Sequence, residues 1–147
     1  MQTSQRAVIV ALENVGVIYP NGVTALRSVS LQLHRGEFAV VLGVSGAGKS
    51  TLLRTINHLQ RPTQGTVTVD GLGDLAIPKI LRTHRQRTGM IFQQHQLIER
   101  QSALQNVLMG RLAYHSFWRS LRPLPQADQR RALDCLERVG LIDKALT

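Results

Sequence analysis

A short glycine-rich stretch at residues 43–50 constrains the fold of this chain more than any other feature. It reads Gly-Val-Ser-Gly-Ala-Gly-Lys-Ser and matches the pattern G-x-x-x-x-G-K-[ST]. An apolar, valine-rich run at residues 38–42 comes directly before it, and a helical pattern that begins at Lys49 and ends before Pro62 comes after it. We therefore expect a strand buried on both faces, a tight loop and a helix in that order, as in an α/β protein.

The residue types in this loop suit the binding of phosphate. Glycines let successive backbone N–H groups turn inward, because a Cβ would block the approach of an anion. The helix that begins at Lys49 presents unpaired N–H groups and the positive end of its dipole to the same anion. The motif assigns Lys49 to the β- and γ-phosphates of a nucleotide and the Ser50 hydroxyl to Mg²⁺.

Other apolar patterns predict further strands and helices. Strands are expected at residues 7–12, 15–19, 29–33, 65–71 and 90–92. Helices are expected at residues 80–87, around 104–112 and at 126–139, with Gly140 at the C-terminal cap of the last one. Strands thus come first, the strand–loop–helix unit follows, and helices end the chain.

The composition indicates a folded chain with a basic surface. Of its 147 residues, 43% are apolar, and no apolar run is long enough to span a bilayer. The 18 Lys and Arg residues against 9 Asp and Glu give a formal net charge of +9. Nearly all of the basic residues are arginine, whose planar fork binds phosphate well, so nucleic acid, anionic lipid and nucleotide are open as partners. A single cysteine, Cys135, excludes an internal disulfide.

A basic cluster at Arg82, His84, Arg85 and Arg87 raises the alternative of a nucleic-acid-binding module. The low aromatic content of 4% and the absence of a nucleic-acid-binding motif weigh against it. We expect His84, like His95, at the surface, and we do not expect nucleic acid as a partner.

The loop and three further segments resemble the ATP-binding-cassette (ABC) transporter ATPases. Residues 43–51, followed by Leu-Leu-Arg, resemble the Walker A region of this family. Residues 19–22 resemble the adenine-stacking residue and the turn after it. Residues 62–67 resemble the hairpin that follows the Walker A helix, and residues 89–94 resemble the Q-loop. The resemblance implies ATP and Mg²⁺ as ligands. It assigns Tyr19 to stacking on adenine, and Gln93, which directly follows Phe92, to contact with Mg²⁺ and the attacking water. The implied nucleotide site is Tyr19, Gly43, Val44, Ser45, Gly46, Ala47, Gly48, Lys49, Ser50 and Thr51, with Lys49 and Gln93 as catalytic residues and Ser50 and Gln93 as metal ligands.

The same resemblance implies a P-loop NTPase fold of the ABC ATPase type. An N-terminal antiparallel β subdomain would be joined to part of a parallel-sheet core and to the start of a helical subdomain. Residues 1–100 would form the nucleotide-binding core, and residues 101–147 would begin the helical subdomain.

The region after the Q-loop narrows the resemblance. Residues 106–112, Tyr114 and residues 117–121 resemble the phosphonate-import ATPases of bacteria. This implies a second ATPase subunit in a homodimer, membrane permease subunits and a periplasmic phosphonate-binding protein as partners. It also implies a peripheral location on the cytoplasmic face of the inner membrane.

Three elements that ATP hydrolysis in this family requires do not occur in the sequence. These are the signature loop Leu-Ser-Gly-Gly-Gln, a Walker B strand ending in Asp-Glu, and a switch histidine. We therefore expect the N-terminal part of an ATPase, which recognises ATP but does not hydrolyse it alone. A regulatory protein that only binds ATP is the remaining alternative.

Overall fold

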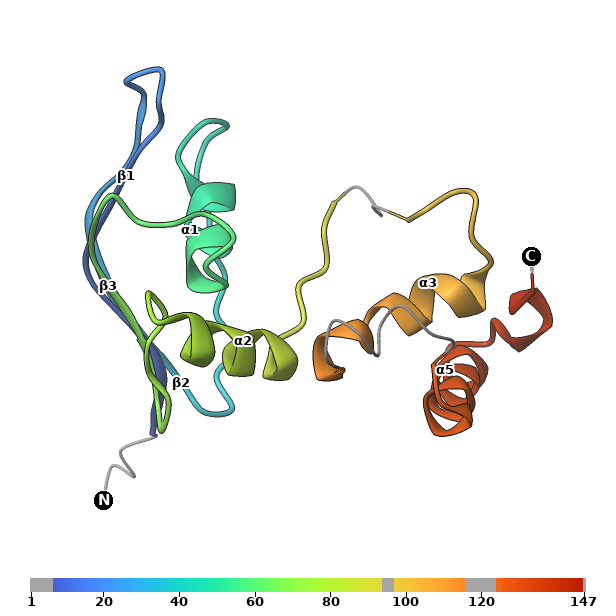
Figure 1. Cartoon of the computed structure of the whole chain (residues 1–147). Helices are drawn as coiled ribbons and strands as arrows, with labels where there is room; N and C mark the ends of the chain where they lie inside the picture. The colour runs from blue at the N-terminus through green and yellow to red at the C-terminus, as the bar shows by residue number, and fades with distance from the viewer. Residues whose placement is uncertain (1–6, 94–96, 116–123, 147) are drawn as a thin grey trace, which may run out of the picture. The chain divides into compact units, whose positions relative to one another are not determined.

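The computed structural model describes residues 7–93, 97–115 and 124–146, and it divides into two compact units, residues 1–90 and 91–147 (Figure 1). Predictions that concern His95 and residues 117–121 lie outside the described residues. The predicted domain boundary at residue 100 stays a prediction. Across the described ranges, no helix combines the length and apolar character needed to cross a membrane.

The first unit is built on a four-stranded antiparallel sheet. Its strands are β1 (Val8–Ile18), β2 (Thr24–His34), β3 (Gln64–Val69) and β4 (Gly73–Asp74), in the order β2-β1-β3-β4. Each neighbouring pair is antiparallel. The predicted antiparallel β subdomain is therefore present, and β1 lies inside the sheet with a partner on each side (Figure 1).

A bulge in β1 merges two predicted strands into one. Residues 7–12 and 15–19 were expected as separate strands, but the pairing of β1 with β2 continues through a register shift between Leu12 and Val15. Asn14 takes a φ of 49° there, and its backbone N–H donates to Ser30 Oγ at 2.9 Å. Gly65 of β3 approaches so closely that a Cβ would lie 2.4 Å from the carbonyl oxygens of Glu13 and Asn14. Only glycine lets β3 pair beside this bulge.

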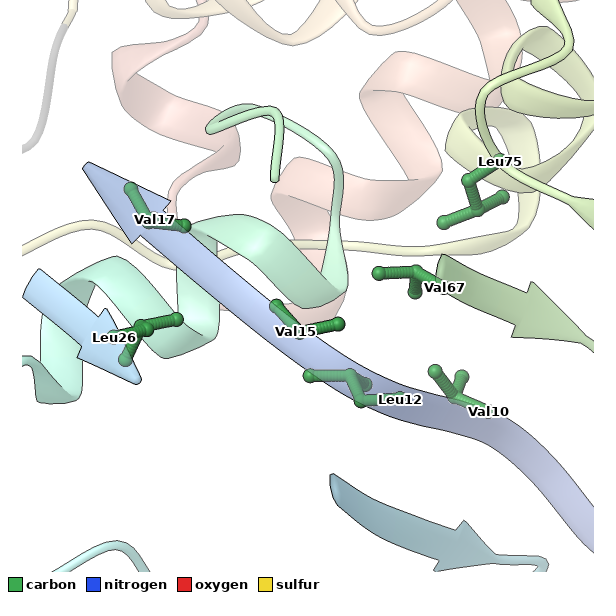
Figure 2. Packing of buried hydrophobic residues seen from close by; sticks show 7 residues of the cluster. All are labelled: Val10, Leu12, Val15, Val17, Leu26, Val67 and Leu75. Atoms are coloured by element: carbon green, nitrogen blue, oxygen red, sulfur yellow. The ribbon is translucent and has the colours of Figure 1, made fainter. Parts of the chain in front are cut away.

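Apolar residues on one face of this sheet form the core of the first unit. Figure 2 shows the buried cluster, which comprises Val10, Leu12, Val15, Val17, Leu26, Val67 and Leu75. Helices α1 (Lys49–Ile56) and α2 (Pro78–Arg87) cover it, through partly buried residues that include Leu52, Ile56 and Ile80. A helix of eight residues is only marginally stable in isolation. Burial of these apolar side chains therefore stabilises α1 against β1 and β2.

Helix α1 ends earlier than the sequence predicts. The helical pattern was expected to continue to Pro62, but His58 takes a left-handed φ of 51°. The N–H of His58 then donates to Thr55 O at 2.9 Å, and the N–H of Leu59 donates to Arg54 O at 2.8 Å. This pair of bonds is the Schellman pattern that closes a helix. Histidine gives only a weak sequence signal for that conformation, which glycine usually supplies.

Two predicted buried strands do not form. Residues 38–42 belong to no helix or strand, and Phe38 and Leu42 are 92% and 86% exposed. Residues 90–92 are likewise not a strand, and Ile91 is fully exposed. A parallel strand buried on both faces needs neighbouring strands and covering helices. The described residues place none of them beside these runs, so the strands expected at residues 38–42 and 90–92 do not form.

The second unit is helical. It contains α3 (Ala103–Met109), a short 3₁₀ helix η1 (Leu112–Tyr114), α5 (Gln126–Arg138) and a second 3₁₀ helix η2 (Ile142–Lys144). Ser102 and Gln105 form a reciprocal capping box at the start of α3. Gly140, with φ of 71°, follows α5, and its N–H donates to Glu137 O at 2.9 Å, as the predicted cap requires.

Two histidines of the first unit are buried, which corrects the expectation that His84 lies at the surface. His84 of α2 is 4% exposed and His58 is 6% exposed. The Arg85 guanidinium donates to His58 O at 2.8 Å. Arg82, Arg85 and Arg87 are exposed, so His84 is the member of the predicted basic cluster that does not lie at the surface. Burial lowers the pKa of both rings, and for His58 the nearby Arg61 and Arg85 charges lower the pKa further.

Acidification should therefore destabilise the first unit. A folded-state pKa below the ordinary value of about 6.5 means that the unfolded chain binds more protons between those two pKa values. The stabilising contribution of the neutral rings is complete above about pH 6.5 and is lost as the pH falls toward the folded-state values. Urea denaturation at a series of pH values measures this slope.

The double variant His58→Asn/His84→Asn should show a flatter pH dependence of the free energy of unfolding. Asparagine at position 58 tolerates the left-handed backbone conformation. An unchanged slope in the double variant would contradict the assignment to His58 and His84.

Candidate nucleotide-binding site

The end of the glycine-rich loop lies against the start of β2. Gly46 and Gly48 both take left-handed backbone conformations, with φ of 80° and 85°. A Cβ on Gly48 would lie 2.4 Å from the carbonyl oxygen of Ala25. Glycine at position 48 therefore permits both the turn and the close approach of the loop to the sheet.

Lys49 folds back over the loop that precedes it. Its Nζ donates to the carbonyl oxygens of Gly43 and Val44, both at 2.7 Å. These bonds span six and five residues, so they close the loop into a ring through the ammonium group of Lys49. The positive charge is thus fixed next to the first turn of α1, where an anion would meet it.

Tyr19 lies beside the same helix turn. The turn at residues 19–22 is closed by the Gly22 N–H donating to Tyr19 O, and the Tyr19 N–H bonds Val23 O, both at 2.9 Å. The Tyr19 hydroxyl lies 3.0 Å from Thr51 Oγ1, with which it shares a hydrogen bond. The strand end that carries Tyr19 and the helix that follows the loop are therefore joined directly by their side chains.

These elements enclose one pocket of about 310 Å³. It is lined by Tyr19, Val23, Thr24, Ala25, Ser45, Gly46, Ala47, Gly48, Lys49, Ser50 and Thr51. Eight of the residues proposed from the sequence thus meet in one place, while Gly43 and Val44 lie outside the lining and hold the lysine. The sequence reasoning missed residues 23–25. The sequence signal that could have identified them is the turn after Tyr19, because this turn brings the start of β2 alongside Tyr19.

The pocket suits an anion with several oxygens. No carboxylate belongs to its lining, and the first turn of α1 carries no acidic residue. Gly48 at the N-cap gives the helix no side-chain cap, so the N–H groups of its first turn are left for a ligand. Ser50 is exposed in the lining, and its hydroxyl makes no hydrogen bond to another described residue, which leaves it able to ligate a cation bound to a phosphate.

Gln93 lies in the second unit, where it is exposed in a bend. Its predicted contact with Mg²⁺ and water stays a prediction. Within the described residues, no three His, Cys, Asp or Glu side chains are grouped to hold a metal ion.

Comparison with solved structures identifies similar folds. An ATP-binding cassette solved as a dimer in a post-hydrolysis state, with bound ADP and Pi, matches with a TM-score of 0.77 at 32% identity. The match covers 94% of this chain and 60% of that one. A dimeric bacterial ABC transporter cassette matches with the same TM-score at 30% identity, covering 95% and 60% of the two chains.

Comparison with curated proteins identifies import ATP-binding proteins. A phosphonates import ATP-binding protein of Trichodesmium erythraeum is 66% identical over 139 residues, covering 95% of this chain and 55% of the relative. A phosphite import ATP-binding protein of Stutzerimonas stutzeri is 62% identical over 139 residues, covering 95% and 50%. The chain therefore spans about half the length of the curated relatives it matches. The family model described as ABC transporter matches residues 26–147, and the chain belongs to that family.

Proposed function

We propose that this chain binds ATP with Mg²⁺ in the pocket between the glycine-rich loop and the start of β2. The observation that carries this proposal is the position of Lys49, which lines the pocket and whose Nζ is held by the carbonyl oxygens of Gly43 and Val44. Lys49 and the first N–H groups of α1 would meet the phosphates. Mg²⁺, when bound, neutralises charge on the phosphate oxygens, and Ser50 is the side chain available to hold it.

The adenine would lie against Tyr19. Tyr19 lines the pocket together with residues 23–25 and residues 45–51. The hydrogen bond between its hydroxyl and Thr51 fixes the ring before any ligand arrives. A ring held in place loses little conformational entropy when a base stacks on it, which supports this assignment.

We further propose that the protein to which this sequence belongs couples ATP binding and hydrolysis to import of a phosphonate or related organophosphorus anion. The names of the relatives from Trichodesmium erythraeum and Stutzerimonas stutzeri support this solute class. Its partners would be a second ATPase subunit, membrane permease subunits and a periplasmic phosphonate-binding protein. It would act peripherally at the cytoplasmic face of the inner membrane, and Gln93 would contact Mg²⁺ and the attacking water.

Removal of the Lys49 charge should weaken ATP binding strongly. The substitution Lys49→Ala deletes charge-assisted bonds to phosphate worth about 2–3 kcal/mol, so the Kd for ATP should rise about 30- to 160-fold. Isothermal titration calorimetry of the full chain with Mg-ATP measures the change. The matched control is Lys79→Ala in α2, which lies outside the pocket lining and should keep the affinity. An unchanged Kd for Lys49→Ala would refute the phosphate site.

Substitutions at Tyr19 should separate base stacking from phosphate binding. Tyr19→Ala should raise the Kd for ATP by about 5- to 160-fold, the range for loss of one base–aromatic stack, and leave the Kd for pyrophosphate unchanged. Tyr19→Phe keeps the ring and removes only the bond to Thr51, so it should bind ATP nearly as well. If Tyr19→Phe weakens both ligands as much as Tyr19→Ala does, the residue positions the helix and does not stack on the base.

The solute class is tested by growth. A strain in which the complete gene is deleted should fail to grow when methylphosphonate is the sole phosphorus source. It should grow normally on inorganic phosphate, and the intact gene supplied on a plasmid should restore growth on methylphosphonate. Normal growth of the deletion strain on methylphosphonate and on phosphite would contradict the proposed solute class while leaving the ATP site untouched.

A further inference from the structure

The helical unit contains a second pocket, which the nucleotide site does not use. It has a volume of about 490 Å³ and lies between the C-terminal end of α3, η1 and one side of α5. Its lining is Val107, Gly110, Arg111, Tyr114, Arg131, Ala132, Asp134, Cys135 and Arg138. Three of these nine residues are arginines, although the pocket floor includes apolar groups such as Val107 and the buried Ala132.

Two of the arginines share one side of α5. Arg131 and Arg138 are seven positions apart, which is about two helical turns, so both face the same pocket. Both are exposed, and neither side chain forms a hydrogen bond or ion pair with another described residue. Their guanidinium donors are therefore available to a ligand.

The third arginine is held rigidly at the pocket wall. Arg111 Nε donates to Asp128 Oδ1 at 2.8 Å, and its guanidinium carbon lies 4.2 Å from the centre of the Tyr114 ring. The other oxygen of Asp128 lies 2.6 Å from His115 Nε2. The hydrogen bond with His115, aided by Arg111, lowers the pKa of the buried Asp128 carboxyl, which keeps it ionised at neutral pH. Asp128 therefore fixes the orientation of Arg111.

The lining is positively charged. Its described residues include three arginines and one carboxylate, Asp134. Asp128, which is not part of the lining, forms an ion pair with Arg111. With Arg111 paired to Asp128, the positive charges of Arg131 and Arg138 exceed the single negative charge of Asp134 in the lining. Planar guanidinium forks bind oxyanions through paired N–H···O bonds, and they suit phosphoryl oxygens in particular.

We propose that this pocket binds an anion with phosphoryl oxygens, held chiefly by Arg131 and Arg138 beside the fixed Arg111. The ligand is either a small soluble anion, such as a phosphonate or inorganic phosphate, or the headgroup of an anionic phospholipid. The site shares no residue with the nucleotide pocket and lies in the other unit, so the proposal stands apart from ATP binding.

The reactivity of Cys135 can be used to measure occupancy of this pocket. Cys135 is the only cysteine in the sequence, is exposed, and lines the pocket. Iodoacetamide, an uncharged reagent, alkylates this thiolate as its sulfur displaces iodide and forms a thioether. A bound anion should shield the sulfur. At a methylphosphonate concentration of about ten times the Kd, the labelling rate of the full chain should fall about tenfold, in proportion to the free site.

Substitution of the two free arginines should remove this protection. In Arg131→Gln/Arg138→Gln, methylphosphonate and inorganic phosphate should no longer slow labelling, each rate being compared with that of the same variant without ligand. The matched control is Arg130→Gln, on α5 but outside the lining, which should be protected like the wild type. Thermal melts followed by circular dichroism verify that the variants are folded.

A parallel experiment identifies the source of the ligand. Vesicles of phosphatidylglycerol are compared with vesicles of phosphatidylcholine, which carry no net charge. Protection by the soluble anions assigns a free anion to the site, and protection only by phosphatidylglycerol vesicles assigns a headgroup, provided that Arg131→Gln/Arg138→Gln abolishes it. No protection by any probe, or equal protection in the double variant, overturns the proposal.

Discussion

The close contact between Gly48 and the carbonyl of Ala25 is the constraint on which the nucleotide pocket depends. A Cβ at position 48 would lie 2.4 Å from that oxygen, so any other residue would push the loop away from the sheet. The contact places the first turn of α1 beside the start of β2. The turn after Tyr19 brings Tyr19 next to the start of β2 as well, so Tyr19 and α1 line the same pocket. Tyr19 and Thr51 then come within hydrogen-bond distance although 32 residues separate them. The pocket is a consequence of this one backbone approach, not of the loop alone.

The sequence predicts those parts of the site that are determined by local chemistry. The loop pattern, the start of α1 at Lys49 and the end of α5 at Gly140 depend on nearby residues, and all three are present. Residues 38–42 show the limit of such reasoning. An apolar run predicts burial only if other strands cover it, and that is a property of distant chain segments.

The remaining differences also have physical causes. The bulge at Asn14 joins two predicted strands into one. Ser30 accepts a hydrogen bond from the Asn14 backbone N–H, and Gly65 leaves room for the bulge. Both partners lie far from Asn14 in the sequence, so the pattern of neighbouring residues does not predict them. His84 was expected at the surface because basic residues surround it in sequence. On a helix its neighbours face other directions, and the ring itself packs inward. The end of α1 was missed because His58 adopts a conformation for which glycine is the usual signal.

Helix α1 explains why the ligand and the fold should stabilise each other. It has only eight residues, so packing and its end groups must maintain it. Its C-terminal end is closed by the Schellman bonds and by Arg85, which donates to His58 O. Its N-terminal end has no side-chain cap and no acidic residue in the first turn. A phosphate at that end would supply the missing acceptors and the favourable charge for the helix dipole. Because a ligand that binds only the folded state stabilises it, nucleotide binding should strengthen the packing of α1 on the sheet that forms the pocket.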